Sequence, residues 1–121
     1  MTPNKEDYLK CIYEIGTEMQ KITNKEIATR MQVSPPAVTE MIKRMKSENL
    51  ILKDKENGYL LTDIGLKLVS ELYRKHRLIE VFLVHHLDYT SDQIHEEAEV
   101  LEHTVSDLFV ERLDKLLGFP K

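Results

Sequence analysis

The segment TNKEIATRMQVSPPAVTEMIKRM, residues 23–45, decides the fold because it contains two short helices and the tight turn that joins them. Thr23 and Glu26 have the spacing of a capping box, in which each side chain satisfies a free backbone donor, so a helix is predicted to begin here. Residues 33–36, VSPP, predict a turn and a new helix start, because serine can cap a helix and proline is tolerated in its first turn. The second helix is expected to end near Asn49.

The flanking segments complete a recognisable pattern. Residues 4–18 have apolar side chains near helical spacing and predict a helix ahead of the pair. After the pair, residues 51–53 and 59–61 are short strand candidates, and the Glu56-Asn57-Gly58 turn between them predicts a β-hairpin. Helices joined by a tight turn and followed by a hairpin form the winged helix-turn-helix pattern.

The rest of the chain is expected to be helical. Thr62 is a suitable cap for a long helix over about 63–86, and the polar break at 89–92 precedes another helix over about 91–104. Ser106 can open a last helix, which should end at Gly118. The expected fold class is therefore mainly α with a small β-wing.

Charge also divides the chain. Residues 1–62 hold ten Lys and Arg against nine Asp and Glu, a balance of +1, whereas residues 63–121 hold seven against twelve, a balance of −5, and contain all five histidines. A near-neutral half can approach phosphate, and an acidic half rich in histidine suits cations. We therefore expect a winged helix-turn-helix DNA-binding domain over residues 1–63 and a helical metal-binding and dimerisation domain over residues 64–121.

Composition restricts the classes of protein that this chain can be. With 121 residues, 41% of them hydrophobic, it can build one domain or two small units that share a core. No segment approaches the roughly 18 apolar residues of a membrane span, and the polar start is no signal peptide. A single cysteine, Cys11, fits a reducing compartment and is expected to be a small buried core residue. The expected location is the cytoplasm.

The second helix of the predicted pair is the element that would enter the major groove of DNA. Side chains at its start can meet bases and phosphates, and lysines further along it and on the wing can meet phosphates. The candidate DNA-binding residues are Ser34, Pro35, Pro36, Ala37, Thr39, Lys43, Lys46, Lys53 and Lys55. Few Arg, Asn or Gln lie near the helix start. This favours recognition of DNA shape and contacts with thymine methyl groups over bidentate hydrogen bonds to bases. The alternative is a scaffold for protein contacts, whose lysines only solvate its surface.

Residues 95–103, HEEAEVLEH, crowd histidine and glutamate together. At about 100° per residue, four of these side chains share one stripe beside the apolar face of the helix. They are His95, Glu99, Glu102 and His103. In the preceding helix, His76 and Glu80 are four residues apart and share a face. Carboxylates and imidazoles without thiolate favour manganese or ferrous iron over structural zinc. A solvated helix face is the alternative.

The same residues do not fit two classes of metalloenzyme. A zinc peptidase of the H-E-x-x-H type needs histidine where this chain has Glu99, and so does its inverted form. A di-iron carboxylate bundle needs paired E-x-x-H motifs, and the sequence contains none. We therefore expect no enzyme.

Four segments together, in this order and spacing, resemble the diphtheria toxin repressor family of metal-activated transcription regulators, and in particular its streptococcal manganese-responsive branch. They are TNKEIATRMQVSPPAVTEMIKRM, GYLLTDIGLKLV, YRKHRLIEVFL and HEEAEVLEH. The resemblance covers essentially the whole chain. It implies a homodimer that binds double-stranded operator DNA when loaded with Mn(II) or Fe(II) and represses metal-uptake genes, with Zn²⁺ able to occupy the site in vitro.

The resemblance also implies two ligand sets. The first would use His76, Glu80 and His95; the second would use Asp7, Glu99, Glu102 and His103. Iron-type members carry methionine and cysteine in place of Asp7 and Glu99, so the carboxylates here resemble the manganese branch. Lys10 stands where members with a tight two-metal cluster have glutamate, so that cluster is not expected. Similar members continue past Lys121 into an SH3-like domain that supplies further ligands, so this chain is expected to be truncated, with an incomplete first site.

The dimer is expected to use the long helix and the last two helices, because the last helix has a rich apolar stripe. The stripe comprises Leu108, Phe109, Leu113, Leu116 and Leu117. Packing of this stripe on the long helix is the alternative. Two other functions stay open on sequence grounds: a winged-helix regulator that senses a small organic ligand, and a metal-dependent hydrolase or oxidase.

Overall fold

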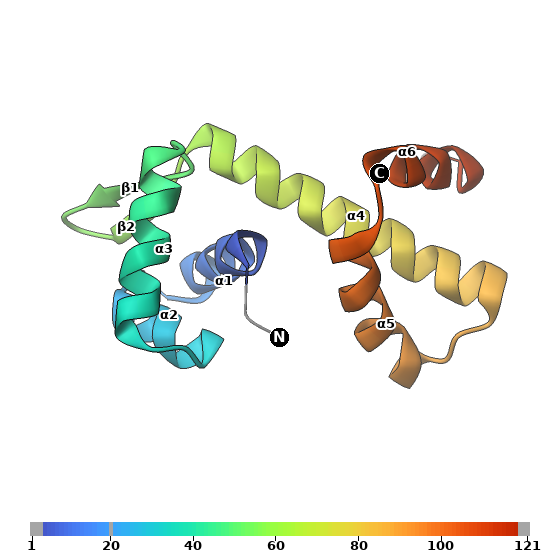
Figure 1. Cartoon of the computed structure of the whole chain (residues 1–121), viewed down its shortest axis with the longest axis horizontal. Coiled ribbons are helices and arrows are strands. Elements are labelled where there is room, and N and C mark those ends of the chain that lie inside the picture. The colour runs from blue at the N-terminus through green and yellow to red at the C-terminus, as the bar shows by residue number, and fades with distance from the viewer. Residues whose placement is uncertain (1–3, 20, 119–121) are drawn as a thin grey trace. The chain divides into compact units, whose positions relative to one another are not determined.

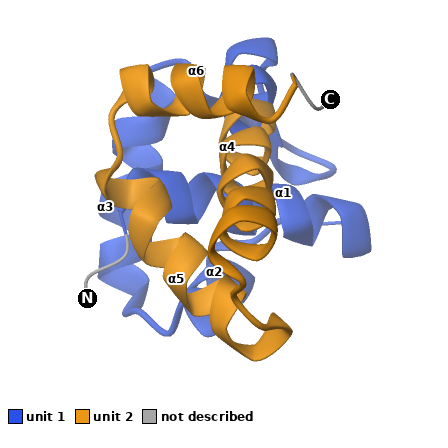
Figure 2. Ribbon diagram, turned by 90° about the vertical axis from the view of Figure 1, so that its right-hand side faces the viewer, with its two compact units in different colours: residues 1–69 blue, residues 70–121 orange. Residues whose placement is uncertain are grey.

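The computed structural model describes residues 4–19 and 21–118 and contains, within these residues, helices and one two-stranded antiparallel sheet (Figure 1). In chain order the elements are α1 (Lys5–Glu18), α2 (Asn24–Met31), α3 (Pro35–Ser47), β1 (Ile51–Asp54), β2 (Gly58–Leu61), α4 (Asp63–Leu87), α5 (Ser91–Thr104) and α6 (Asp107–Leu116). The predicted fold class, mainly α with a small β-wing, is confirmed. The contacts divide the chain into two compact units, Met1–Val69 and Ser70–Lys121, coloured separately in Figure 2.

The α2–turn–α3 pair forms at the predicted place, but only the Thr23 half of the predicted capping box is present. The Thr23 hydroxyl accepts a hydrogen bond from Glu26 N, at 3.1 Å, while the Glu26 carboxylate pairs with Arg30 at 3.0 Å. Gln32 ends α2 in the left-handed conformation, with φ of 55°, and Ser34 Oγ accepts from Ala37 N to open α3. A left-handed residue after a helix lets the chain reverse sharply. A turn of only a few residues therefore suffices to pack α3 against α2.

Apolar side chains from the three helices form the interior of the first unit. Helices α1, α2 and α3 contact one another, and β1 and β2 contact α3 and α1. The fully buried side chains include Leu9, Ile12, Ile15, Ile27, Val38 and Met45. Burial of a side chain of this size contributes about 1.5–3 kcal/mol. This interior leaves the opposite side of α3 exposed.

Backbone hydrogen bonds fix both ends of the wing, and they involve residues of the segments next to the helices. β1 pairs with β2 in antiparallel register, Ile51 opposite Leu61. Ile22 N donates to Asn57 O at 2.8 Å, and Thr62 N donates to Leu50 O at 3.0 Å. The Thr62 hydroxyl also accepts from Gly65 N at 3.0 Å, which is the predicted cap of α4. The hairpin is therefore held in place by backbone hydrogen bonds beyond its own ladder.

The second unit is built from three helical segments around a small core. Leu78, Ile79 and Leu83 of α4 pack with Ala98 of α5 and Leu113 of α6. A loop with Asp88 in the left-handed conformation, φ 56°, separates α4 from α5. The Thr90 N–H donates to Gln93 Oε1 at 3.0 Å at the start of α5, and Ser106 Oγ accepts from Phe109 N at the start of α6. Packing of α5 across α4 brings the histidine-bearing faces of both helices together.

The predicted apolar stripe of α6 separates into two faces. Leu113 is buried, and Leu117 packs against the core of the second unit. Leu108, Phe109 and Leu116 are 59%, 42% and 58% exposed. Packing on the neighbouring helices thus accounts for only part of the stripe. The three exposed side chains lie on the outward side of α6, which also carries the exposed Arg112.

Candidate metal centre and nucleic-acid interface

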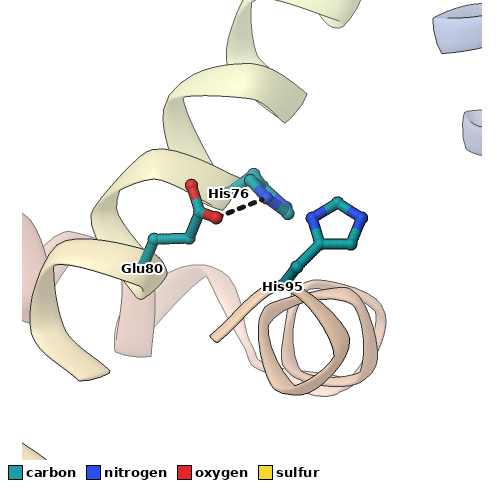
Figure 3. A group of neighbouring side chains, drawn as sticks. All are labelled: His76, Glu80 and His95. Carbon is teal, nitrogen blue, oxygen red and sulfur yellow. Dashed lines mark ion pairs between the residues drawn. The ribbon is translucent and has the colours of Figure 1, made fainter. Parts of the chain in front are cut away.

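His76, Glu80 and His95 meet where α4 and α5 pack. One donor atom of each lies within 4.8 Å of the other two (Figure 3). Glu80 Oε2 is 3.3 Å from His76 Nε2, and the rings of His76 and His95 have centroids 5.7 Å apart in an edge-on arrangement. Glu80 follows His76 by one turn of α4, so both project from the same helical face toward α5.

The chemistry of these donors fits a divalent cation. Donors bound to one ion at about 2.0–2.2 Å can be at most about 4.4 Å apart, so only small side-chain movements are needed to close the group on an ion. Imidazole nitrogens and a carboxylate oxygen suit manganese, ferrous iron and zinc. The side chains of His76 and Glu80 are 15% and 31% exposed, whereas His95 is exposed, so an ion could enter from the His95 side.

A second group of donors lies along α5. Glu99 and Glu102 approach His76, with donor atoms of the three within 4.8 Å of one another. Glu102 is only 2% exposed, and its Oε2 lies 3.2 Å from His76 Nδ1. His103 is half-buried on the same helix. A carboxylate removed from water needs a hydrogen-bond donor or a cation nearby, and the His76 imidazole lies within hydrogen-bond distance of Glu102.

The remaining predicted ligand, Asp7, belongs to the first unit. It is the third residue of α1 and forms a capping box with Asn4: Asp7 Oδ2 accepts from Asn4 N, and Asp7 N donates to Asn4 Oδ1, both at 3.0 Å. These two bonds fix the start of α1 and the position of the Asp7 carboxylate. This capping role of Asp7 was not predicted from the sequence, although the Asn-x-x-Asp spacing is typical of a capping box.

Sequence reasoning also missed the contact between His76 and Glu102. The two residues are 26 positions apart on different helices, and their contact depends on how α5 crosses α4. Tyr89 gives α5 a further attachment, since its hydroxyl donates to Glu97 Oε2 at 2.6 Å. This hydrogen bond to the carboxylate raises the pKa of Tyr89 above its usual value.

The candidate DNA-binding residues lie on one unit and are almost all exposed. Ala37 alone among them is half-buried; the exposed ones are Ser34, Pro35, Pro36, Thr39, Lys43, Lys46, Lys53 and Lys55. Ser34 Oγ is used in the cap of α3, and the Thr39 hydroxyl donates to Pro35 O at 3.2 Å. Both hydroxyl oxygens retain capacity to accept a hydrogen bond. The opposite side of α3 carries the buried Val38, Ile42 and Met45.

Within the described residues, no helix is long and apolar enough to cross a membrane.

Comparison with known proteins assigns each part of the chain. Residues 1–59 match the family described as iron dependent repressor, N-terminal DNA binding domain. Residues 62–121 match iron dependent repressor, metal binding and dimerisation domain. The first description agrees with the exposed lysines of α3 and the wing, and the second agrees with the histidine and glutamate donors of α4 and α5.

Individual proteins similar to this chain are also transcriptional regulators. The structure of ScaR with bound Zn²⁺ is 77% identical, with a TM-score of 0.93, over 98% of this chain and 56% of that chain. The HTH-type transcriptional regulator MntR of Bacillus pumilus (strain SAFR-032) is 30% identical over 118 residues, 98% of this chain and 81% of that protein. The diphtheria toxin repressor of Corynebacterium diphtheriae (strain ATCC 700971 / NCTC 13129 / Biotype gravis) is 33% identical over 112 residues, 93% of this chain and 50% of that protein.

The chain thus spans about half the length of ScaR and of the diphtheria toxin repressor. The matched residues and these relatives show that the chain belongs to the iron-dependent repressor family of metal-dependent transcriptional regulators, which are not enzymes.

Proposed function

We propose that this protein is a repressor that binds operator DNA when divalent metal is bound and controls genes for metal uptake. The observation that carries the proposal is the meeting of His76, Glu80 and His95 in a chain that also has a winged helix-turn-helix. Only a difference in metal affinity between DNA-competent and incompetent states can switch such a protein. Residues 1–63 would bind DNA, and residues 64–121 would bind metal and form the dimer.

The first metal site is proposed to consist of His76, Glu80 and His95. Their donors are already close together, and each nitrogen or oxygen is a ligand type that Mn²⁺ and Fe²⁺ accept. The relative ScaR is described as a manganese-activated repressor and also binds Zn²⁺ and Cd²⁺. We propose Mn²⁺ as the physiological activator, with Fe²⁺ as an alternative.

The second metal site is proposed to take Glu99, Glu102 and His103 from α5. Asp7 of α1 is added on the family resemblance alone. Because these ligands come from segments about ninety residues apart in sequence, an ion that engages all four would restrict the motion of the DNA-binding helices. Such a restriction gives the metal a preference for one arrangement, which a switch requires.

DNA contact is proposed for the exposed side of α3 and for the wing. Lysines 43, 46, 53 and 55 would neutralise phosphates, and the start of α3 would face the base edges. A second copy of the chain is the proposed partner, with the exposed α6 face formed by Leu108, Phe109 and Leu116 as part of the contact. We place the protein in the cytoplasm, where it would have access to chromosomal DNA.

A selection experiment tests the proposal. A fragmented duplex-DNA pool is passed over the purified chain with Mn²⁺ and, separately, with a chelator. Sequence-selective retention only with Mn²⁺ is expected. Equal retention in both conditions would contradict the metal switch, and no retention in either would contradict DNA binding by this chain.

Matched variants assign the effect to the proposed residues. His76→Ala should abolish Mn²⁺-dependent retention, whereas Glu96→Gln, an exposed glutamate next to His95, should leave it unchanged. Lys43→Ala should weaken retention of all DNA sequences. It should also reduce the slope of log affinity against log salt concentration by about 1, the value expected for the loss of one phosphate contact. Loss of retention in Glu96→Gln as well would show that the effect of His76→Ala is not specific to the proposed ligands.

A further inference from the structure

Both ring nitrogens of His76 face a carboxylate. Nε2 lies 3.3 Å from Glu80 Oε2, and Nδ1 lies 3.2 Å from Glu102 Oε2. The two carboxylates come from different helices, since Glu80 is on α4 and Glu102 is on α5. His76 is thus oriented from both sides of its ring, and these two contacts have different consequences for metal binding.

A neutral imidazole that binds a cation must keep its proton on the other nitrogen. His76 shares a donor group with Glu80 and His95, and Nε2 is the nitrogen that faces Glu80, so Nε2 would provide the lone pair. The proton would then be on Nδ1, where Glu102 Oε2 is placed to accept it. Acceptors of this kind fix both the tautomer and the orientation of a ligating histidine.

The burial of Glu102 strengthens its contact with the His76 ring. Its residue is 2% exposed, whereas the side chains of His76 and Glu80 are 15% and 31% exposed. A hydrogen bond to a buried carboxylate is stronger than one made in water, so rotation of the His76 ring away from Glu102 would lose a stabilising contact. The two contacts together favour the ring orientation in which Nε2 faces Glu80 and Nδ1 faces Glu102.

We infer that Glu102 is a positioning residue for the His76–Glu80–His95 site, where it holds His76 in the Nδ1–H tautomer, in addition to the ligand role proposed for it at the second site. The inference rests on the proposed metal-binding function. Glu102 would thus influence metal binding at the first site without being a ligand there, because it acts through His76 on α4.

The tautomer of His76 can be measured without any variant. Two-bond ¹H–¹⁵N NMR of the full chain loaded with Zn²⁺, a diamagnetic probe, distinguishes a protonated Nδ1 from a protonated Nε2. We expect Nδ1–H with Nε2 bound to the metal. Nε2–H with metal on Nδ1 would overturn the inference.

Variants then separate positioning from ligation. The ring signals of His95, which belongs only to the first site, report first-site affinity for Zn²⁺ in competition with a chelator. Glu102→Ala should lower that affinity about 10–100-fold, the usual effect of removing such an acceptor. Glu102→Gln should retain it within a few-fold, because the amide oxygen can still accept from Nδ1–H while it is a poor ligand for the second site.

His103→Ala is the matched control. It removes a donor of the second site without removing the acceptor of His76, so first-site affinity should stay unchanged. A loss equal to that in Glu102→Ala would show that an empty second site is the cause, and an unchanged affinity in Glu102→Ala would show that positioning is unnecessary. Either result overturns the inference while Zn²⁺ binding by the wild-type chain still stands. Failure of Zn²⁺ and Mn²⁺ to affect His95 in the wild-type chain would instead contradict the proposed function.

Discussion

The Tyr59 hydroxyl, on the second strand of the wing, donates a hydrogen bond of 2.6 Å to Asn24 Oδ1 at the start of α2. This bond joins residues 35 positions apart and connects the wing to the helix that precedes the proposed recognition helix. Together with the backbone bond from Ile22 to Asn57, it sets the position of the hairpin relative to α2.

Tyr59→Phe removes this hydrogen bond and little else. We expect a loss of about 0.5–1.5 kcal/mol in the free energy of unfolding, because the partly buried Asn24 oxygen loses its donor. Chemical denaturation of the wild type, Tyr59→Phe, Asn24→Ala and the double variant forms a double-mutant cycle. Additive losses in that cycle would show that the bond contributes nothing.

Gly65, in the first turn of α4, lies against the backbone of Leu50, in the segment between α3 and β1. A Cβ added there would be 2.1 Å from Leu50 O, which is far inside the contact distance. Gly65→Ala should therefore lower the free energy of unfolding by at least about 1–3 kcal/mol, through forced backbone movement. The measurement is urea unfolding followed by circular dichroism.

Gly16→Ala provides the opposite case for comparison. Gly16 is an exposed residue of α1, and a Cβ there would meet only the flexible end of Ile22, at 3.3 Å. Alanine favours a helix over glycine by about 0.5–1 kcal/mol, so this variant should not be destabilised. Equal destabilisation of both variants would contradict the argument from backbone contact.

Most of the fold was predictable because its signals are local. The caps at Thr23, Ser34 and Thr62 lie at the expected places, and the hairpin forms around the predicted turn. The grouping of His76 with Glu80 was also predictable, because a spacing of four residues on a helix puts two side chains on one face.

The remaining features depend on how the helices pack. Neither the contact between His76 and Glu102 nor the ion pair between Arg74 and Asp114 follows from spacing, because each joins different helices. The division of the α6 stripe into buried and exposed leucines likewise depends on which side of α6 meets the core. Periodicity identifies an apolar face but not the element that will cover it.

Burial raises the pKa of the Cys11 thiol to about 11, with a further contribution from Glu14. The folded state therefore keeps the proton up to a higher pH than the unfolded state, so stability is complete below pH 9 and falls as the pH rises through 11. Cys11→Ala should show a smaller fall in melting temperature between pH 9 and pH 11 than the wild type.

The same property protects the thiol from reagents. Because the thiolate is the reactive form, a disulfide reagent should modify folded Cys11 far more slowly at pH 8 than the urea-unfolded chain. Equal rates in the two states would contradict the burial of Cys11, which is 7% exposed.

The exposed apolar face of α6 predicts self-association. Leu116→Glu places a charge on a side chain that is 58% exposed, so it should leave the monomer folded while it weakens a dimer formed through this face. Sedimentation equilibrium measures the change in the monomer–dimer equilibrium. Leu52→Glu, which changes an equally apolar side chain on the wing, 45% exposed, is the control and should leave the dimer intact. Dissociation by both changes, or by neither, would contradict the use of α6.

The central claim, that metal and DNA binding are coupled, is tested most directly by reciprocity. The factor by which saturating Mn²⁺ raises the affinity for DNA must equal the product, over all the ions bound, of the factors by which that DNA raises the affinity for Mn²⁺. The measurement is Mn²⁺ affinity, by competition with a chelator, in the presence and absence of a saturating duplex recovered from the retention experiment. We predict tighter Mn²⁺ binding with the duplex, and the increases multiplied over all bound ions should equal the factor found in the DNA titration. An Mn²⁺ affinity unchanged by DNA would contradict the metal switch.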